Sequence, residues 1–496
     1  MKKKTEFFTL LTGYVLQYLI GIVSIRVLTS IISPQDVGRI NIITAIALWF
    51  NIVINGAIMY VQRKIFEWDS RGLGRKYVGF FILFLFIAAA LGSASVVLLK
   101  KIFGVGVIIT DYWLVILVFG WVFFYNLNCA FINWLNLFKK RILFVVLSNL
   151  SLFLAVALSI LLSLNVRTGE RWLFGQIAGQ MIMLCLSSVL FFKSLRPANK
   201  NNVIYANQES ATSILNFIWP ISVASLLAWM QSQFYRFILG RTAGIEIVGL
   251  FAIGFGLGMN LINKFEILFN QFYQPVFFKE ISGSTPKQKT LACNRYAANL
   301  IPAVFIIATF IIINSPFIAR LFVGDKFYSV AKDTIIWGVL SQSFMVFTTI
   351  YSFAGIAQEH TKGFIMPNVL GAVVTVSVVF LLSHRDLYLG TGFALFIGPF
   401  LATWLMRLKM KKVLPISSPK KELILALLLV LPLVIAITLI RSIIRTPNIF
   451  VSLLIVSISG IYVLLAMMVI MREAFSFKIN FANVVENNIA RFLNVN

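Results

Sequence analysis

The stretch LILALLLVLPLVIAITLI, residues 423–440, contains no charged residue and a single polar side chain, Thr438. A helix needs about 20 mainly apolar residues to cross the hydrocarbon core of a bilayer, so this stretch predicts a membrane-spanning helix. Apolar runs of similar length recur along the chain and are separated by short basic loops. The sequence therefore predicts an all-α, polytopic membrane protein.

About fourteen runs are long enough to span a bilayer at about 20 residues each. Of the 496 residues, 59% are hydrophobic and 12% are charged, whereas a soluble protein carries about 25% charged residues. This composition leaves no room for a sizeable soluble domain. The expected spans are 8–32, 39–62, 77–99, 107–137, 142–164, 171–193, 213–240, 247–277, 296–321, 333–357, 363–383, 388–408, 422–440 and 449–471.

The basic residues indicate topology rather than a nucleic-acid partner. Lys and Arg number 43 against 17 Asp and Glu, a net charge of +26, and they lie mainly in loops between the apolar runs. Loops on the side of the N-terminus hold more than twice as many Lys and Arg as loops on the opposite side. Because cytoplasmic loops carry the excess of Lys and Arg, both termini are expected in the cytoplasm.

The most polar stretch of the chain divides the spans into two groups. Residues 198–211 are expected to form a cytoplasmic linker between an N-terminal bundle of spans 1–6 (1–197) and a second bundle of spans 7–12 (212–412). Spans 13 and 14 fall within 413–471, outside this arrangement, and 472–496 form a cytoplasmic tail. The expected architecture is two six-helix bundles plus two extra C-terminal helices.

The two bundles share a short pattern. Arg26, near the end of span 1, is followed twelve residues later by Gly38, and Arg236, near the end of span 7, is followed thirteen residues later by Gly249. The first spans of the two bundles have the same predicted orientation. The bundles are therefore expected to be pseudo-symmetric, parallel repeats about an axis normal to the membrane.

Arg26 and Arg236 are the most informative charges inside the predicted spans. Each lies about seven residues from the outer end of its span, on the order of 10 Å deep. A charge at that depth is costly unless it snorkels or faces a wet cavity. Equivalent positions in two repeats would bring both arginines toward one central cleft, where two cations suit an anionic ligand such as a phosphate.

Three other charged residues are weaker candidates. Lys264 either lines an inner cavity or snorkels, and Arg63 either contacts substrate at the cytoplasmic mouth or serves as a positive-inside anchor. Glu266 is one of very few carboxylates within a span, which makes it a candidate proton or sodium carrier. Lys264 and Glu266 are two residues apart and point about 200° away from each other on a helix, so they are not an obvious ion pair.

Asn51 and Asn55 lie four residues apart on one face of span 2. Such side chains can hydrogen-bond to sugar hydroxyls, or they can hold helices together. His360, His384 and the three cysteines show no metal-ligand spacing. We expect no metal site and no cofactor.

Several motifs resemble the polysaccharide-transport family, the O-antigen and capsule-repeat flippases of the MATE-like exporter superfamily. The opening segments Arg26–Thr29 and Pro34–Gly38 look like the start of that family's pattern. The resemblance covers most of residues 8–412. The other matching elements are Gly56, Arg63, Trp219-Pro220, Arg236–Gly240, Val248–Phe251 and Phe322–Phe327, the last resembling a short external loop.

The resemblance implies fourteen helices in two bundles around a central cleft. It implies alternating access that moves a polyprenyl-diphosphate-linked oligosaccharide to the outer leaflet of the bacterial inner membrane, with the arginines holding the diphosphate. Polysaccharide polymerase and chain-length machinery are the protein partners that this role implies. One position departs from the pattern, because Tyr235 stands where the family often has an acidic residue. No role for such a carboxylate can be transferred.

Two alternatives remain open at this point. The first is a multidrug exporter, or an exporter of another lipid-linked precursor, of the same superfamily; cationic drugs would need acidic residues, and the spans offer almost none. A membrane glycan polymerase or glycosyltransferase would need acid, base or positioning residues on substantial external loops. The predicted external loops are short and hold few carboxylates, so a non-enzyme is the preferred interpretation.

Overall fold

The computed structural model describes residues 2–103, 110–138, 140–196, 211–281, 284–358, 360–383, 386–444 and 447–470. In this part of the chain the structure is helical and contains no strand. The helices are α1 (Lys2–Ile31), α2 (Pro34–Ser70), α3 (Gly74–Phe103), α4 (Asp111–Gly120), the π-helix η1 (Trp121–Tyr125), α5 (Asn126–Leu137), α6 (Arg141–Asn165), α7 (Gly169–Phe192), α8 (Ala211–Gln233), α9 (Tyr235–Thr242), α10 (Ile245–Ile281), α11 (Pro286–Ile313), α12 (Ser315–Phe322), α13 (Asp325–Ala357), the 3₁₀-helix η3 (Thr361–Phe364), α14 (Ile365–Leu382), α15 (Leu389–Val413), α16 (Lys420–Ile443) and α17 (Ile449–Ile470).

The helices have the length and surface of membrane-spanning segments. Among the described residues, 13 helices are long and apolar enough to cross a membrane, and the apolar part of α1, Val15–Ile31, is shorter. Large apolar side chains lie exposed along them; Phe450 is 83% exposed and Leu91 67% exposed. Such a surface suits hydrocarbon rather than water. The prediction of an all-α polytopic membrane protein is confirmed.

Helix α2 extends beyond its predicted span at both ends. It starts at Pro34, where Ser33 is the N-cap and its hydroxyl accepts a hydrogen bond from the backbone N–H of Asp36. Proline at the first helical position and an acidic residue in the first turn both favour a helix start. At the other end, Gly72 has a positive φ of 70° in the turn that leads to α3. The helix is 37 residues long.

Two predicted spans are interrupted near the ends that the charge distribution predicts to be external. The span expected at 213–240 consists of α8 and α9, with Phe234 between them, and the span expected at 296–321 consists of α11 and α12, with Asn314 between them. The external loop expected at 322–327 is only Val323 and Gly324, because α13 starts at Asp325 with an acidic residue in its first turn. The structure thus has shorter connections than the apolar pattern predicts.

The described residues form two compact units. Unit 1 falls within Met1–Phe255, Phe322–Thr334 and Asn368–Gly398, and unit 2 within Gly256–Leu321, Ile335–Pro367 and Pro399–Asn496. The predicted division at 197 and 212 stays a prediction. The predicted linker, apart from Ala211 at the start of α8, and the predicted tail after residue 471 lie outside the described residues.

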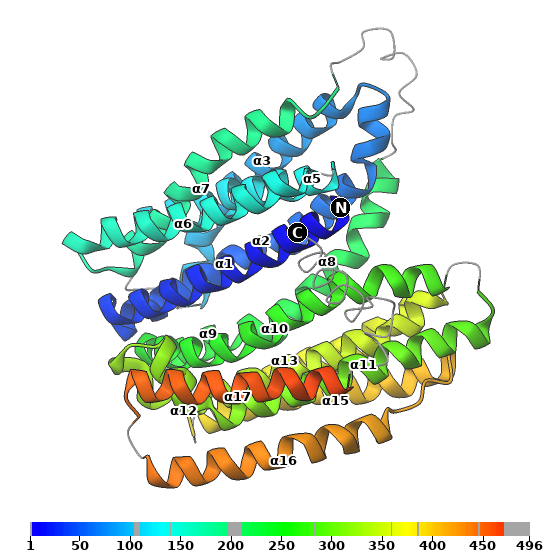
Figure 1. Ribbon diagram of the computed structural model, residues 1–496. Helices are drawn as coiled ribbons and strands as arrows, with labels where there is room; N and C mark the ends of the chain where they lie inside the picture. The colour runs from blue at the N-terminus through cyan, green and yellow to red at the C-terminus, as the bar shows by residue number, and fades with distance from the viewer. Residues whose placement is uncertain are drawn as a thin grey trace, which may run out of the picture. The chain divides into compact units, whose positions relative to one another are not determined.

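In unit 1, helices α5, α6 and α7 contact one another and lie side by side (Figure 1). Small residues allow the close approach of α6 and α7. A Cβ atom added to Gly179 would lie 2.6 Å from Cα of Ala155, and one added to Gly175 would overlap the backbone of Ser159. Glycines four residues apart are a common way for membrane helices to pack closely.

A buried hydrogen-bond network joins the same three helices. Asn128 of α5 donates to Oγ of Ser151 at 2.9 Å and to Oε1 of Gln180 at 2.7 Å. Its own carbonyl oxygen accepts from Ser187 at 2.7 Å, and Ser151 donates to Gln180 at 2.8 Å. Because the members satisfy one another, this network supports helix packing rather than binding.

Replacing Asn128 with leucine is expected to destabilise unit 1 by about 1–3 kcal/mol, because Gln180, Ser151 and Ser187 would each lose a hydrogen bond. The measurement is the thermal unfolding midpoint of the detergent-solubilised protein. Ser188→Ala is the matched control, since Ser188 lies next to the network residue Ser187 on the same helix but donates only to the carbonyl of Cys185. Equal midpoints for the two variants would contradict the role assigned to the network.

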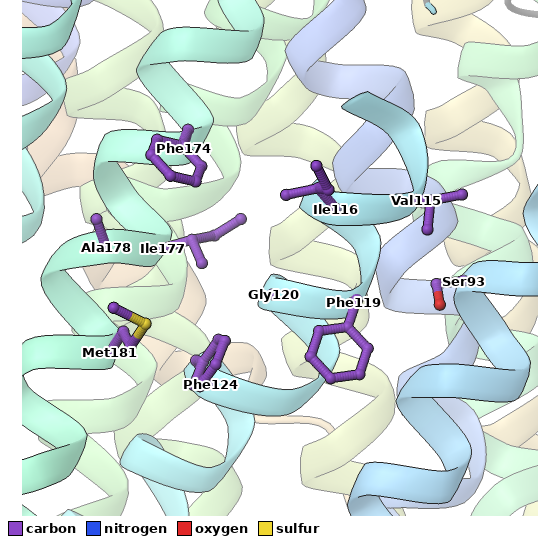
Figure 2. A pocket seen from close by; sticks show the side chains of 10 residues that line it. All are labelled: Ser93, Val115, Ile116, Phe119, Gly120, Phe124, Phe174, Ile177, Ala178 and Met181. Carbon is purple, nitrogen blue, oxygen red and sulfur yellow. The ribbon is translucent and has the colours of Figure 1, made fainter. Parts of the chain in front are cut away.

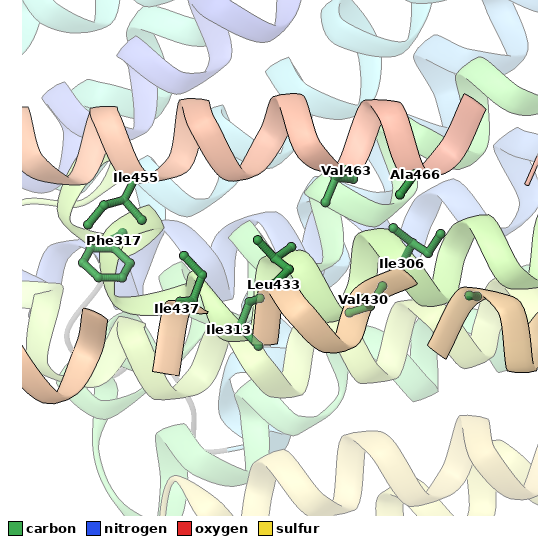
Figure 3. Packing of buried hydrophobic residues seen from close by; sticks show 10 residues of the cluster. Ile306, Ile313, Phe317, Val430, Leu433, Ile437, Ile455, Val463 and Ala466 are labelled. Carbon is green, nitrogen blue, oxygen red and sulfur yellow. The ribbon is translucent and has the colours of Figure 1, made fainter. Parts of the chain in front are cut away.

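In unit 2, α16 and α17 pack against α11 and against each other. Their buried side chains form one apolar cluster with α11 and α12, as Figure 3 shows. The hydroxyl of Tyr462 in α17 donates to the carbonyl of Leu429 in α16 at 2.6 Å. The two C-terminal helices are therefore attached through α11 by apolar packing. The labelled members of the cluster are Ile306, Ile313, Phe317, Val430, Leu433, Ile437, Ile455, Val463 and Ala466.

Candidate functional site

Polar side chains lie along one side of α2. When α2 is projected at 100° per residue, four polar residues fall within an arc of about 100° around the helix axis. These residues are Asn41, Thr44, Asn55 and Arg63, and we call this side of the helix the α2 arc. Apolar residues at the opposite side of the helix, such as Ile43, are buried. From Asn41 to Arg63 the helix rises about 33 Å, close to the hydrocarbon thickness of about 30 Å.

Arg236 is bound to the Asn41 end of the α2 arc. Its Nη1 donates to the carbonyl of Asn41 at 3.0 Å and to Oγ1 of Thr44 at 3.5 Å, and its Nε donates to the hydroxyl of Tyr235 at 3.4 Å. These partners are neutral, and Arg236 has no carboxylate partner among the residues that the structure describes. Its charge is therefore available to an anionic ligand.

Tyr235, which stands where the family often has an acid, is part of the packing around this arginine. It is 2% exposed, and its ring lies 5.4 Å from the ring of Phe251 and 5.7 Å from the ring of Phe255. A hydroxyl at this position can hydrogen-bond to Arg236 without neutralising it, whereas a carboxylate would pair with it. The substitution keeps the Asn41 end of the arc cationic.

Arg63 lies at the other end of the α2 arc and is exposed. Its guanidinium carbon lies 5.4 Å from the ring centroid of Phe217 in α8, a cation–π distance. Helices α2 and α8 are close here because Gly56 faces Ile218, whose carbonyl oxygen would lie 3.2 Å from an added Cβ. No described carboxylate pairs with Arg63, so both ends of the arc carry an unneutralised cation.

Between the two ends, the predicted pair of asparagines has two different environments. Asn51, at the edge of the arc, is buried, and its Oδ1 accepts from Asn126 of α5 at 2.9 Å. Asn55 is exposed within the arc. Leu48 and Ile52 occupy the arc between Thr44 and Asn55. The structure thus gives Asn51 a contact between helices and leaves Asn55 accessible to a ligand.

Arg26 also belongs to unit 1, and it contacts the connection between α12 and α13. Its Nη1 donates to the carbonyl of Val323, between α12 and α13. In the same region the backbone N–H of Gly324 donates to Oγ1 of Thr29 at 2.9 Å. Arg26 therefore holds the end of α1 against this connection, and contact with substrate stays a prediction for it.

Lys264 and Glu266 lie on α10 in unit 2 and do not form an ion pair, as their spacing predicts. Lys264 is exposed. Glu266 is partly buried, and the side-chain amides of Gln342 and Asn270 lie near its carboxylate. The hydroxyl of Tyr296 in turn donates to Oδ1 of Asn270. Glu266 is thus the centre of a polar cluster. Among the described residues, no group of three or more His, Cys, Asp or Glu side chains could hold a metal ion.

The structure brings Arg236 together with α2, a contact that sequence reasoning missed. Asn41 and Thr44 supply its partners, although neither was a candidate. A signal was present, because projecting the span from Asn55 at 100° per residue places Asn41 and Thr44 in the same arc. The polar residues near the start of that predicted span could have been included on this basis.

Residues that the predicted repeat aligns also contact each other. A Cβ atom added to Gly249 would lie 2.8 Å from the backbone nitrogen of Gly38 and would overlap the carbonyl oxygen of Pro34. One added to Gly38 would in turn overlap the carbonyl oxygen of Ile245. The first turns of α2 and α10 therefore meet in backbone contact. The pseudo-symmetry of the two bundles stays a prediction.

Comparison with known proteins gives similarity at the level of the fold. No protein-family model matches the chain, and no curated protein matches it. A solved structure of lipid II flippase MurJ in an inward closed conformation has a TM-score of 0.65, with 14% identity over 95% of this chain and 99% of that chain.

Transporters of the MOP superfamily are also similar. An outward-facing multidrug resistance MATE family transporter has a TM-score of 0.55 and 14% identity over 82% of this chain and 93% of its own. A MOP superfamily transporter from Pyrococcus furiosus, with a binding pocket of reverse polarity, has a TM-score of 0.55 and 13% identity over 82% and 94%. The chain therefore has the fold of these flippase and transporter structures.

Proposed function

We propose that this protein is a flippase that moves polyprenyl-diphosphate-linked oligosaccharide repeat units from the cytoplasmic to the outer leaflet by alternating access. The observation that carries the proposal is the α2 arc, which places a cation at each end of a path about 33 Å long. Such a path offers an anionic headgroup a partner on both sides of the hydrocarbon core. The product would serve the synthesis of O-antigen, capsule or a related polysaccharide.

The two ends of the arc would act at different stages of transport. Arg63, at the predicted cytoplasmic end, would bind the diphosphate first, and Arg236 would bind it at the outer end. A guanidinium can hold a diphosphate through two parallel hydrogen bonds, and the neutral partners of both arginines leave their charges available. Asn55, exposed between them, would hydrogen-bond to sugar hydroxyls.

The remaining predicted residues have supporting roles in this proposal. Arg26 would contribute positive potential near the outer end while holding Val323. Lys264 would be a further cationic contact in unit 2. Glu266, beside the amides of Asn270 and Gln342, would carry the coupling proton or sodium ion.

The fold and the charge distribution favour this function over the alternatives. One of the similar structures is that of a lipid II flippase, so the fold is compatible with a lipid-linked substrate. A multidrug exporter is the second candidate, since MATE transporters share the fold, but the α2 arc is cationic and would repel cationic drugs. A glycan polymerase finds no support among the similar structures named above, which are those of a flippase and of transporters.

The proposed setting is the bacterial inner membrane, with both termini in the cytoplasm. The protein would receive its substrate from enzymes that build the lipid-linked repeat on the cytoplasmic side. It would deliver the product to polymerase and chain-length machinery on the outer side. This arrangement agrees with the excess of Lys and Arg in the loops predicted to be cytoplasmic.

The experiment that tests the proposal measures which leaflet holds the lipid-linked glycan in cells that lack the protein. We expect the glycan to accumulate facing the cytoplasm, and the restored wild-type protein to clear it. Sided enzymatic labelling of the oligosaccharide reports its leaflet. If single repeats reach the outer leaflet without the protein but are not polymerised, the enzyme alternative replaces the flippase.

A further inference from the structure

A cavity of about 240 Å³ lies in unit 1 between α3, α4, η1 and α7. Its wall is apolar and rich in rings, as Figure 2 shows, with Phe119 and Phe124 on one side and Phe174 on α7. Ser93 is the polar side chain in the lining, and its hydroxyl already donates to the carbonyl of Ala90 at 3.0 Å. No lining group requires water, and an apolar cavity of this kind stays dry.

Local backbone geometry forms this cavity. Gly120 ends α4 and lacks a side chain on its wall; a Cβ atom added there would lie 2.6 Å from Cγ2 of Ile177. The next five residues form the π-helix η1, which contains Phe124. The side-chain amide of Asn126 donates to the carbonyl of Val122 at 2.9 Å and so satisfies a π-helical carbonyl. π-Helical turns inside membrane helices are often found at functional positions.

The cavity opens at the surface of helices that are long and apolar enough to span a membrane. Its rim residues Ile116, Phe174 and Met181 are 46%, 39% and 45% exposed and lie in membrane-spanning helices. Ile116 and Phe174 each lie five residues after the start of their helix, on the order of 8 Å along the axis. Close packing leaves few voids of this size in a protein interior, so a chain from the membrane is the expected occupant.

The cavity lies toward the same end of unit 1 as Arg236. Helix α7 starts at Gly169, whose added Cβ would lie 2.5 Å from the carbonyl oxygen of Asp36 in the first turn of α2. Arg236 binds the same part of α2, at Asn41. Both sites therefore belong to the end that the charge distribution places on the outer side.

We infer that this cavity binds a segment of the isoprenoid chain of the lipid carrier, which rests on the proposed function. A methyl-branched, unsaturated chain suits a wide recess walled by phenyl rings and by the adaptable side chain of Met181. A straight acyl chain of a bulk phospholipid would fill such a recess less completely. The bound tail would keep the carrier beside unit 1 while its diphosphate is at the Arg236 end.

Photo-crosslinking of the full-length protein in proteoliposomes tests this site. The probe is a polyprenyl phosphate with a diazirine on its isoprenoid chain, and a phosphatidylglycerol with a diazirine on its acyl chain is the comparison. We expect the polyprenyl probe to label peptides of α4 and α7, and unlabelled polyprenyl phosphate to compete for this labelling. Labelling without competition, or equal labelling by the phospholipid probe, would overturn the inference.

Filling the cavity gives a second measurement. Ala178→Trp and Ile116→Trp, from opposite walls, are expected to lower the competed labelling about tenfold, a loss of about 1.4 kcal/mol in binding. Leu186→Trp is the matched control, because Leu186 is an exposed residue of the same helix outside the lining. Undiminished labelling in both filled variants would contradict the site. The competition in the unsubstituted protein decides the inference even if a filled variant does not fold.

Transport in the same proteoliposomes separates this inference from the proposed function. If the protein transports a lipid-linked oligosaccharide but unlabelled polyprenyl phosphate does not compete for labelling of α4 and α7, the isoprenoid site is overturned and the proposed flippase function stands. Competed labelling without transport of any lipid-linked oligosaccharide would contradict the flippase and leave the site in place.

Discussion

Replacing Gly249 with alanine is expected to lower the transport rate about 30-fold. The added Cβ atom would lie 2.8 Å from the backbone nitrogen of Gly38 and would overlap the carbonyl oxygen of Pro34, so the first turns of α2 and α10 could not stay in contact. Overpacking of this kind costs on the order of 2 kcal/mol, and about 1.4 kcal/mol corresponds to a tenfold shift in an equilibrium. A cycle that needs this packed arrangement would slow accordingly.

Initial transport rates and the accessibility of the α2 arc measure the effect. In a variant without native cysteines, Leu48→Cys would place a thiol within the arc. We expect a membrane-impermeant maleimide, added from outside, to react faster with this thiol when Gly249→Ala is also present. The reason is that the conformation in which the first turns of α2 and α10 are packed together would be less populated.

Gly256→Ala is the matched control on the same helix. A Cβ atom added to Gly256 meets no atom within 4 Å, and glycine-to-alanine substitution favours a helix by about 1 kcal/mol at either position. The two variants therefore differ in the contact and not in helix propensity. Equal rates and equal thiol reactivity for Gly249→Ala and Gly256→Ala would show that the contact has no role in transport.

Arg236→Gln is expected to weaken transport of a diphosphate-linked substrate by about tenfold to a hundredfold, which corresponds to the 1.5–3 kcal/mol of a charge-assisted hydrogen bond. Glutamine keeps an amide donor near the carbonyl of Asn41 but removes the charge and the planar fork. The effect should appear mainly as a higher apparent KM for the lipid-linked substrate. The measurement is the initial rate as a function of substrate concentration in proteoliposomes.

Two variants separate substrate binding from packing at this position. Arg241→Gln removes an exposed arginine from the last turn of the same helix and should leave KM unchanged. Arg236→Lys keeps the charge and should recover part of the affinity. If Arg236→Gln lowers the unfolding midpoint but leaves KM unchanged, Arg236 is a structural link between α9 and α2 and the proposed role is wrong.

Much of the fold could be predicted because apolar length is a direct physical requirement of a membrane span. The 18 residues at 423–440 lie within α16, and the other predicted spans correspond to described helices. The breaks at Phe234 and Asn314 were missed although the sequence marks both: polar Gln231, Ser232 and Gln233 precede the first, and Ser315-Pro316 follow the second. The start of α2 at Pro34 was missed because the capping by Ser33 precedes the apolar stretch.

The candidate site was less accessible to sequence reasoning. Arg236 and Arg63 could be selected because charges within or at the edge of apolar spans are rare. Their neutral partners depend on contacts between segments far apart in the chain, as between Arg236 and Asn41. The cavity beside Gly120 also escaped prediction, because its lining residues are individually ordinary apolar residues of membrane helices.

Purified protein in proteoliposomes allows flipping to be measured without other cell components. A fluorescent polyprenyl-diphosphate disaccharide is placed in both leaflets, and a membrane-impermeant quencher reports the fraction that reaches the outer leaflet with time. We expect wild-type protein to move the diphosphate-linked probe and the Arg63→Gln/Arg236→Gln double variant, equally folded and reconstituted, not to move it. Movement at the same rate by both proteins, or by neither, would contradict the proposed function.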